Sequence, residues 1–198
     1  MSIAGAPGRR GAQGPRPKGR GRGQNRPSPT VSLVRVYVPA TLAMLQQLVA
    51  DRLLHARNGT AFAVTPRLRE AYAEGDDEEL ADVALRDAAL ASLRLLAGEG
   101  TSDLPPRRAV VVAEVEGVTP RPDLDDSVVR LSGPLSYDDV IAAYVDNADA
   151  EPAVLPAIEA VDAADLGDED AEFVVGDAQD HDLAWYAPQE LPFLLELL

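Results

Sequence analysis

The sequence contains no cysteine among its 198 residues. This absence excludes disulfide bonds, zinc sites built on thiolates and cysteine nucleophiles, and it is typical of a reducing compartment. No apolar run approaches the roughly 20 residues that a membrane-spanning helix requires. The positively charged N-terminus has no apolar segment behind it, so it does not have the pattern of a secretory signal. We therefore expect a cytoplasmic protein without a membrane-spanning segment.

Basic residues are scarce outside the first 30 residues. Residues 1–30 carry seven basic side chains and no acidic one, whereas residues 31–198 hold the other 11 basic side chains, all 33 acidic ones and no lysine. The second segment therefore has a net charge of −22, which repels phosphate backbones and leaves few cations for a phosphorylated substrate. The charge pattern predicts a basic tail, residues 1–30, and a single acidic domain, residues 31–198.

The tail holds seven of the 15 glycines, five of the 16 prolines and almost no large apolar side chains. Such a composition cannot bury enough apolar surface to offset the entropy of ordering, so we predict disorder. In Lys18–Gly23 cations alternate with glycines, a pattern that favours loose binding of nucleic acid, although no aromatic residue is interleaved. Three alternatives stay open: a solubilising extension, a segment that lies back on the acidic domain, and a true start that lies downstream.

Strands and helices alternate in the first half of the domain, and strands cluster in the second half. The five apolar residues Ala109–Ala113 are typical of a strand covered on both faces and therefore of a central strand. The order predicts an α+β fold, a two-layer sandwich with helices mainly on one face of a mixed sheet. The expected strands are residues 32–38, 61–64, 109–113, 127–131, 140–145 (with a helix as the alternative), 173–175 and 183–187, the last two as a hairpin, and the expected helices are residues 42–53, 66–75, 76–97 and 151–163.

Capping residues mark three helix starts. Thr41 precedes the first helix, and Thr65 precedes Pro66, which suits the first helical position because proline lacks an N–H. Asp76 and Glu79 have the spacing of a capping box before the longest helix. This spacing explains the acidic run from Asp76 to Glu79 as a helix start instead of a binding site.

His181 is the stronger of two histidine candidates for chemistry, because it lies between Asp180 and Asp182. One hypothesis makes it a general base or metal ligand oriented by a carboxylate, in a small metal-assisted hydrolase that also uses a remote carboxylate. The alternative, which we favour, is a solvated turn, because sequence neighbours seldom point at one centre. His55 lies at the end of the first helix, where an exposed or capping role is expected.

The sequence lacks a GxSxG nucleophile elbow, a glycine-rich phosphate loop and an HExxH zinc motif. The acidic residues 123–126 lack the glycine and terminal glutamate of a calcium loop, and we interpret them and residues 165–170 as solvated loops. Arg107 and Arg108 precede the central strand, where edge solvation explains them as well as substrate binding does. We therefore expect no metal site and no cofactor, and we favour a non-catalytic role, with the metal-assisted hydrolase that uses His181 as the alternative.

Trp185, Tyr186, Gln189 and Glu190 form the most distinctive local group. Aromatic side chains with polar neighbours suit either the edge of a core or a contact surface, and we favour the core edge. The apolar end, Pro188–Leu198, is expected to dock on the core, with a partner-binding tail as the alternative. The leading hypothesis is a non-catalytic protein-interaction or regulatory domain whose contacts involve these residues, with nucleic acid bound only through the tail if at all.

Five short segments carry a family resemblance: Val34–Thr41, Ala63–Pro66, Asp77–Leu80, Ala91–Leu93 and Trp185–Glu190. Together they resemble an uncharacterised family of actinobacterial hypothetical proteins over about residues 33–190. That family has no established activity, so the resemblance implies a domain extent and a compartment but no reaction. Its members begin near the first strand, which implies that residues 1–30 are an addition. Members often carry a histidine before the Val-Asp that corresponds to Val145-Asp146, where this chain has Tyr144, so no histidine site is implied there.

Overall fold

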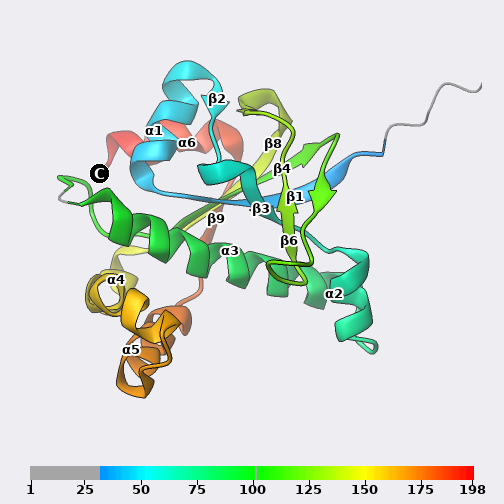
Figure 1. Cartoon of the computed structure of the whole chain (residues 1–198). Helices are drawn as coiled ribbons and strands as arrows, with labels where there is room; N and C mark the ends of the chain where they lie inside the picture. The colour runs from blue at the N-terminus through cyan, green and yellow to red at the C-terminus, as the bar shows by residue number, and fades with distance from the viewer. Residues whose placement is uncertain (1–31, 101) are drawn as a thin grey trace, which may run out of the picture. The chain divides into compact units, whose positions relative to one another are not determined.

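The centre of the fold is a seven-stranded sheet, seen in a computed structural model that describes residues 32–100 and 102–198 (Figure 1). All of its strand pairs are antiparallel. The strands in spatial order are β5 (Thr119–Pro120), β6 (Val128–Arg130), β3 (Thr60–Phe62), β1 (Val34–Ala40), β4 (Ala109–Val115), β8 (Val140–Val145) and β9 (Ala184–Tyr186). β4 pairs with β1 on one side and β8 on the other, so the predicted central strand is confirmed. The predicted disorder of residues 1–30 concerns a segment outside the described residues.

The remaining elements are helices, short 3₁₀ turns and a second, two-stranded sheet. That sheet pairs β2 (Leu53–Leu54) with β7 (Leu135–Ser136). The α-helices are α1 (Leu42–Asp51), α2 (Pro66–Ala71), α3 (Asp77–Glu99), α4 (Glu151–Asp165), α5 (Glu169–Gln179) and α6 (Leu191–Glu196), and the 3₁₀ turns are η1 (Arg57–Gly59), η2 (Tyr137–Asp139), η3 (Ala148–Ala150) and η4 (Pro188–Glu190).

The three predicted helix caps are confirmed. The Thr41 hydroxyl accepts a hydrogen bond from the Met44 N–H at 3.3 Å, and the Thr65 hydroxyl accepts one from the Leu68 N–H at 3.0 Å. Before α3, Asp76 accepts from the N–H groups of the first turn while the Glu79 carboxylate accepts from the Asp76 N–H at 3.1 Å, which completes the capping box. These bonds satisfy backbone donors that have no partner inside the helix.

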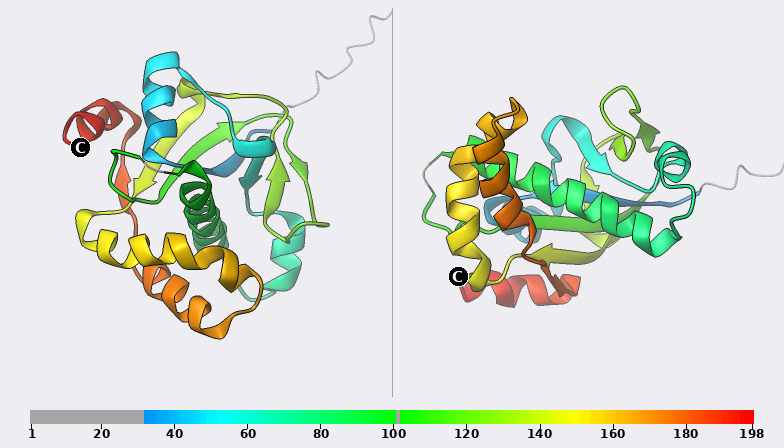
Figure 2. Two further views of the ribbon diagram at one scale, coloured as in Figure 1. Left: turned by 60° about the vertical axis from the view of Figure 1, so that its left-hand side comes forward. Right: turned by 90° about the horizontal axis from the view of Figure 1, so that it is seen from below.

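The two faces of the sheet are covered by different helices. On one face, alternate residues of β1 such as Val36 and Val38 share a core with Leu45 and Leu48 of α1. On the other face, Tyr37 packs with residues of α3. Helices α4 and α5 lie beside each other outside α3 and enclose a third cluster with it (Figure 2).

The predicted α+β class is confirmed, and two details differ from the prediction. The sheet is antiparallel instead of mixed, and helices cover both faces instead of mainly one. The sequence pattern of β4 explains the second difference: residues Ala109–Ala113 are buried without alternation, so an apolar surface faces each side of the sheet and each needs a cover.

The predicted terminal hairpin is wrong. Phe173–Val175 lies inside α5, so it cannot be the hairpin partner of the last strand. That strand, β9, pairs with β8 instead. Asp168 caps α5 by accepting from the Ala171 N–H at 3.0 Å, and Ala171, Val175 and Ala178 form its buried stripe. Spacings of four and three residues place these side chains on one helical face, so the helical period overrides the strand preference of Phe-Val-Val.

The expectation that Pro188–Leu198 docks on the core is confirmed. Leu191 is fully buried in the cluster that contains α1, and Leu194 and Leu195 pack against the same cluster. The Tyr137 hydroxyl donates to the Pro188 carbonyl oxygen at 2.5 Å, which ties the start of this segment to η2. Among the described helices, none combines the length and the hydropathy needed to cross a membrane.

Candidate functional site

His181 and Asp182 lie at a small cavity, and Asp180 does not line it. The cavity has a volume of about 200 Å³ and is bounded by α3 on one side and by the segment between α5 and β9 on the other. Its lining residues are Asp82, Leu85, Arg86, Ala89, Arg108, Gln179, His181, Asp182 and Leu183. The structure therefore brings two of the three predicted residues to one place, together with side chains from α3 and with Arg108, which directly precedes β4, that sequence reasoning did not connect with them.

A buried ion pair between Arg108 and Asp146 underlies this cavity. The Arg108 Nε donates to Asp146 Oδ2 at 2.9 Å and Nη2 donates to Oδ1 at 2.8 Å, while the Arg108 backbone N–H also donates to Oδ2 at 2.8 Å. Both residues are almost inaccessible, with 2% and 1% of their surfaces exposed. Of the two explanations left open for Arg108, edge solvation does not hold, because the side chain is buried.

The same guanidinium also fixes the segment that carries His181. Arg108 Nη2 donates to the His181 carbonyl oxygen at 2.8 Å. Arg108 precedes β4, Asp146 follows β8, and His181 precedes β9. One side chain thus connects the ends of three adjacent strands, β4, β8 and β9. The position of the His181 backbone is therefore fixed by a buried guanidinium.

Two negatively charged and two positively charged side chains line the cavity. Asp82 and Arg86 come from one face of α3, because residues four apart in a helix lie one above the other. Arg108 and Asp182 complete the charged lining. Across residues 32–100 and 102–198, no three His, Asp or Glu side chains are grouped so that they could hold a metal ion.

The aromatic group before the C-terminus divides between surface and core. Trp185 is 57% exposed, whereas Tyr186 packs against the core cluster that contains α1. The favoured interpretation as a core edge therefore holds for Tyr186 and is wrong for Trp185. Gln189 and Glu190 are exposed, and Glu190 accepts a hydrogen bond from the Ala187 N–H at 2.7 Å, so its carboxylate has a capping role.

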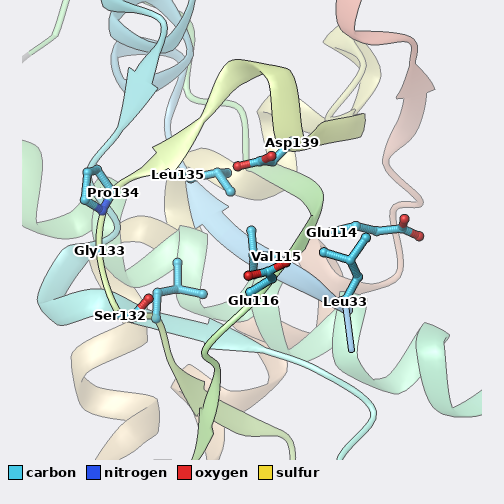
Figure 3. Close-up of a pocket in the computed structure, with 10 residues that line it drawn as sticks. Leu33, Glu114, Val115, Glu116, Ser132, Gly133, Pro134, Leu135 and Asp139 are labelled. Atoms are coloured by element: carbon cyan, nitrogen blue, oxygen red, sulfur yellow. The ribbon is translucent and has the colours of Figure 1, made fainter. Parts of the chain in front are cut away.

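A second cavity, of about 310 Å³, lies near Leu33 at the end of β4 (Figure 3). Glu114, Glu116 and Asp139 line it together with the loop Ser132–Pro134. Figure 3 shows that Glu114 and Asp139 come from separate segments and that their carboxylates point in different directions. Glu114 is also paired with Arg35 at 2.9 Å. These acids lie around the cavity as separate groups, and no signal in the sequence connects them.

The acidic clusters that we interpreted as solvated loops contain ion pairs. Hydrogen bonding from Arg121, at 2.7 Å, lowers the pKa of Asp123 to about 2. Hydrogen bonding from Arg94, at 2.7 and 2.8 Å, lowers the pKa of Asp165. Each of these two carboxylates is stabilised in its charged form by a neighbouring guanidinium, so the pairs account for Asp123 and Asp165 without a bound cation.

Asp87 differs from these carboxylates because no cation pairs with it among the described residues. Burial raises the pKa of Asp87, and the Ser127 hydroxyl, which donates to Asp87 Oδ2 at 2.6 Å, opposes that shift. Ser127 is itself fully buried and directly precedes β6. The bond links α3 to the sheet, and neither residue lines the cavity at His181.

The comparisons with known proteins gave one match. A model described as a family of unknown function (DUF6912) matches residues 34–195, close to the extent that the resemblance predicted. No curated protein and no solved structure matches the chain. The resemblance to an uncharacterised family is confirmed, and its actinobacterial origin stays a prediction. Because the match covers most of the chain, this protein belongs to the family of unknown function DUF6912.

Proposed function

We propose that this protein is a protein-interaction module whose contact surface is the C-terminal edge, defined here as residues 184–198. The observation that supports the proposal is the exposed indole of Trp185 on β9. Tryptophan is among the side chains most enriched at the energetic centres of interfaces, because it combines a large apolar area with one hydrogen-bond donor.

The helix that follows β9 adds apolar surface to this edge. Phe193 is 68% exposed, and Leu197, four residues later, is also exposed. The opposite side of α6 is anchored by Leu191, Leu194 and Leu195. A helix that buries one stripe and exposes another has a second apolar face available for a partner.

The backbone of β9 offers a further means of contact. β9 is the last strand of the seven-stranded sheet and pairs with β8 only, so no described strand pairs with its outer side. A strand at the edge of a sheet can accept an extended segment of another chain through main-chain hydrogen bonds. We therefore propose an extended peptide as the partner's binding element.

The charge of the domain favours a basic peptide. Residues 31–198 have a net charge of −22. Asp180, Asp182, Glu190 and Glu196 lie within or next to the C-terminal edge and are exposed or partly exposed. Complementary charge accelerates association and rejects acidic competitors.

The test is selection from a displayed library of random peptides. We expect the wild type to enrich peptides with basic residues between apolar or β-branched ones. Trp185→Ser should reduce the binding of the enriched peptides at least about tenfold, since truncation of a central aromatic residue costs about 2 kcal/mol or more. The matched control is Phe173→Ser, which removes an aromatic side chain that is 76% exposed on α5, outside the C-terminal edge.

Two results would contradict this proposal. One is a selection that enriches no peptide family. The other is an equal loss of binding in Trp185→Ser and Phe173→Ser, which would place the contact outside the C-terminal edge. Circular dichroism of both variants checks that neither substitution changes the fold.

Two earlier hypotheses remain as alternatives. The metal-assisted hydrolase is supported only by the position of His181 at a cavity. Its test is whether a divalent cation raises the melting temperature of the wild type and whether His181→Ala abolishes this rise.

The nucleic-acid tether depends on residues 1–30, outside the described residues. Its test is whether deletion of these residues removes binding to RNA or DNA and the salt dependence of that binding.

A further inference from the structure

The cavity at His181 contains a buried side chain with unused hydrogen-bonding capacity. Arg108 uses Nε and Nη2 for Asp146 and the His181 carbonyl oxygen. Its third nitrogen, Nη1, lies across the guanidinium from the Asp146 carboxylate and makes no hydrogen bond to any described residue. Since Arg108 is 98% buried and lines the cavity, Nη1 can find an acceptor there. Nη1 is not among the buried side-chain atoms that lack a partner, so it is open to the cavity and available to a bound group that accepts hydrogen bonds.

Arg86 provides a second guanidinium at the same cavity. It forms no ion pair with a described carboxylate. Two arginines that line one small cavity are suited to a carboxylate, which accepts from the planar guanidinium through both of its oxygens. Because the charge of Arg108 is already balanced by Asp146, Arg86 supplies the positive charge that attracts a carboxylate.

Asp82 and Asp182 supply negative charge at the same lining. With Asp146 beneath, three carboxylates oppose two guanidinium groups, so a phosphate with two negative charges is disfavoured. A simple cation is disfavoured by Arg86 and Arg108. A small molecule with one carboxylate and one ammonium group complements both signs, because each end is matched by an opposite charge.

The rest of the lining is apolar and small. Leu85 and Ala89 come from α3, and Leu183 comes from the segment before β9. The volume of about 200 Å³ is smaller than the pockets that hold nucleotides or drug-sized molecules. The geometry points to a binding site for a free amino acid with a short aliphatic side chain, whose carboxylate binds Arg86 and Arg108 and whose ammonium group faces Asp82 or Asp182.

The test uses calorimetric titration of the full chain with four matched probes. L-leucine has both charges and an aliphatic side chain, leucinamide lacks the carboxylate, isocaproate lacks the ammonium group, and isoamylamine lacks the carboxylate and has only the chain and amine. We expect leucine to bind and each of the other three to bind at least roughly tenfold more weakly, because each leaves one set of charged groups without a partner.

Two pairs of variants assign the binding to the cavity. Arg86→Gln and Asp182→Asn should each weaken leucine binding by roughly tenfold. The matched controls are Arg57→Gln and Asp180→Asn, which remove the same charges at exposed positions that do not line the cavity. All four positions are exposed, so the fold should tolerate each substitution.

The inference is overturned if leucine shows no binding at millimolar concentration, if leucinamide, isocaproate or isoamylamine binds as tightly as leucine, or if the control variants lose binding to the same extent as the cavity variants. These outcomes are separate from those of the peptide selection, because the peptide test depends on Trp185 and the calorimetric test depends on Arg86 and Asp182.

Discussion

The Arg108–Asp146 and Arg94–Asp165 pairs share one geometry in two different surroundings. In each pair Nε and Nη2 donate to the two carboxylate oxygens, at 2.9 and 2.8 Å for the first and at 2.8 and 2.7 Å for the second. The side chains of Arg108 and Asp146 are 2% and 0% exposed, whereas those of Arg94 and Asp165 are 42% and 41% exposed. The comparison separates the effect of burial from the effect of hydrogen-bond geometry.

The surroundings decide what each pair can contribute. Water screens the Arg94–Asp165 pair, so it adds little to stability beyond holding the end of α4 near α3. The Arg108–Asp146 pair has lost its water, so each charge depends on the other. A shift of β8 against β4 would separate the buried charges, and we therefore interpret this pair as a device that fixes the alignment of three strands.

The largest expected effect comes from breaking the buried pair. Arg108→Met leaves Asp146 charged, buried and without its cation, and we expect a loss of about 3–5 kcal/mol in the free energy of unfolding. Urea denaturation measures this change. The neighbouring substitution Arg107→Met is the matched control, because Arg107 pairs with Glu151 at 2.7 Å at a partly exposed position and should cost less than half as much.

A double substitution distinguishes the buried charge from the loss of packing. Arg108→Met combined with Asp146→Leu removes both charges, and we expect it to recover most of the stability lost in Arg108→Met, as apolar replacements of buried pairs often do. A single variant that costs no more than Arg107→Met would contradict the role assigned to burial. A double variant as unstable as the single one would assign the loss to packing and to the bond with the His181 carbonyl oxygen instead of to the unpaired charge.

The buried pair also marks the limit of what the sequence predicts. Thr41, Thr65 and Asp76 were identified as caps because capping bonds join residues two to four apart, so the signal is local. Arg108 and Asp146 are 38 residues apart, and the pair depends on how β4 aligns with β8. The sequence shows two arginines, Arg107 and Arg108, before an apolar strand, but nothing in this pattern distinguishes a buried arginine from a solvated one.

The candidate site was predicted in part, for the same reason. His181 and Asp182 were singled out from their sequence neighbourhood, yet Arg86 and Arg108 come to the cavity through tertiary packing. The error at residues 173–175 is of another kind: Phe-Val-Val favours a strand, while the apolar spacing of Ala171, Val175 and Ala178 favours a helix. The helical period was the stronger signal there because it extends over the whole segment.

Asp87 adds a third case to the comparison of the buried and exposed ion pairs, because this carboxylate is largely buried but has no cation partner among the described residues. Burial raises the pKa of Asp87 above the ordinary value of 3.8, so its contribution to stability is greatest below that pH and is lost as pH rises through the raised pKa. Asp87→Asn removes this ionisation and can still accept from Ser127. At pH 7 we expect a gain of less than about 1 kcal/mol, which shrinks as pH falls toward 4. Urea denaturation at both pH values measures it, and a gain that does not change with pH would contradict ionisation as its cause.

The smallest expected effect comes from the exposed pair. Arg94→Gln removes the hydrogen bonds that lower the pKa of Asp165, and we expect a loss of less than about 1 kcal/mol at pH 7. Because that pKa lies below its unfolded value, the contribution is present above about pH 4 and disappears as pH falls through the folded pKa. Salt at about 1 M should remove most of the effect, since screening acts on exposed charges, whereas the loss in Arg108→Met should change little. A salt dependence shared equally by Arg94→Gln and Arg108→Met would show that water reaches both pairs and that burial does not separate them.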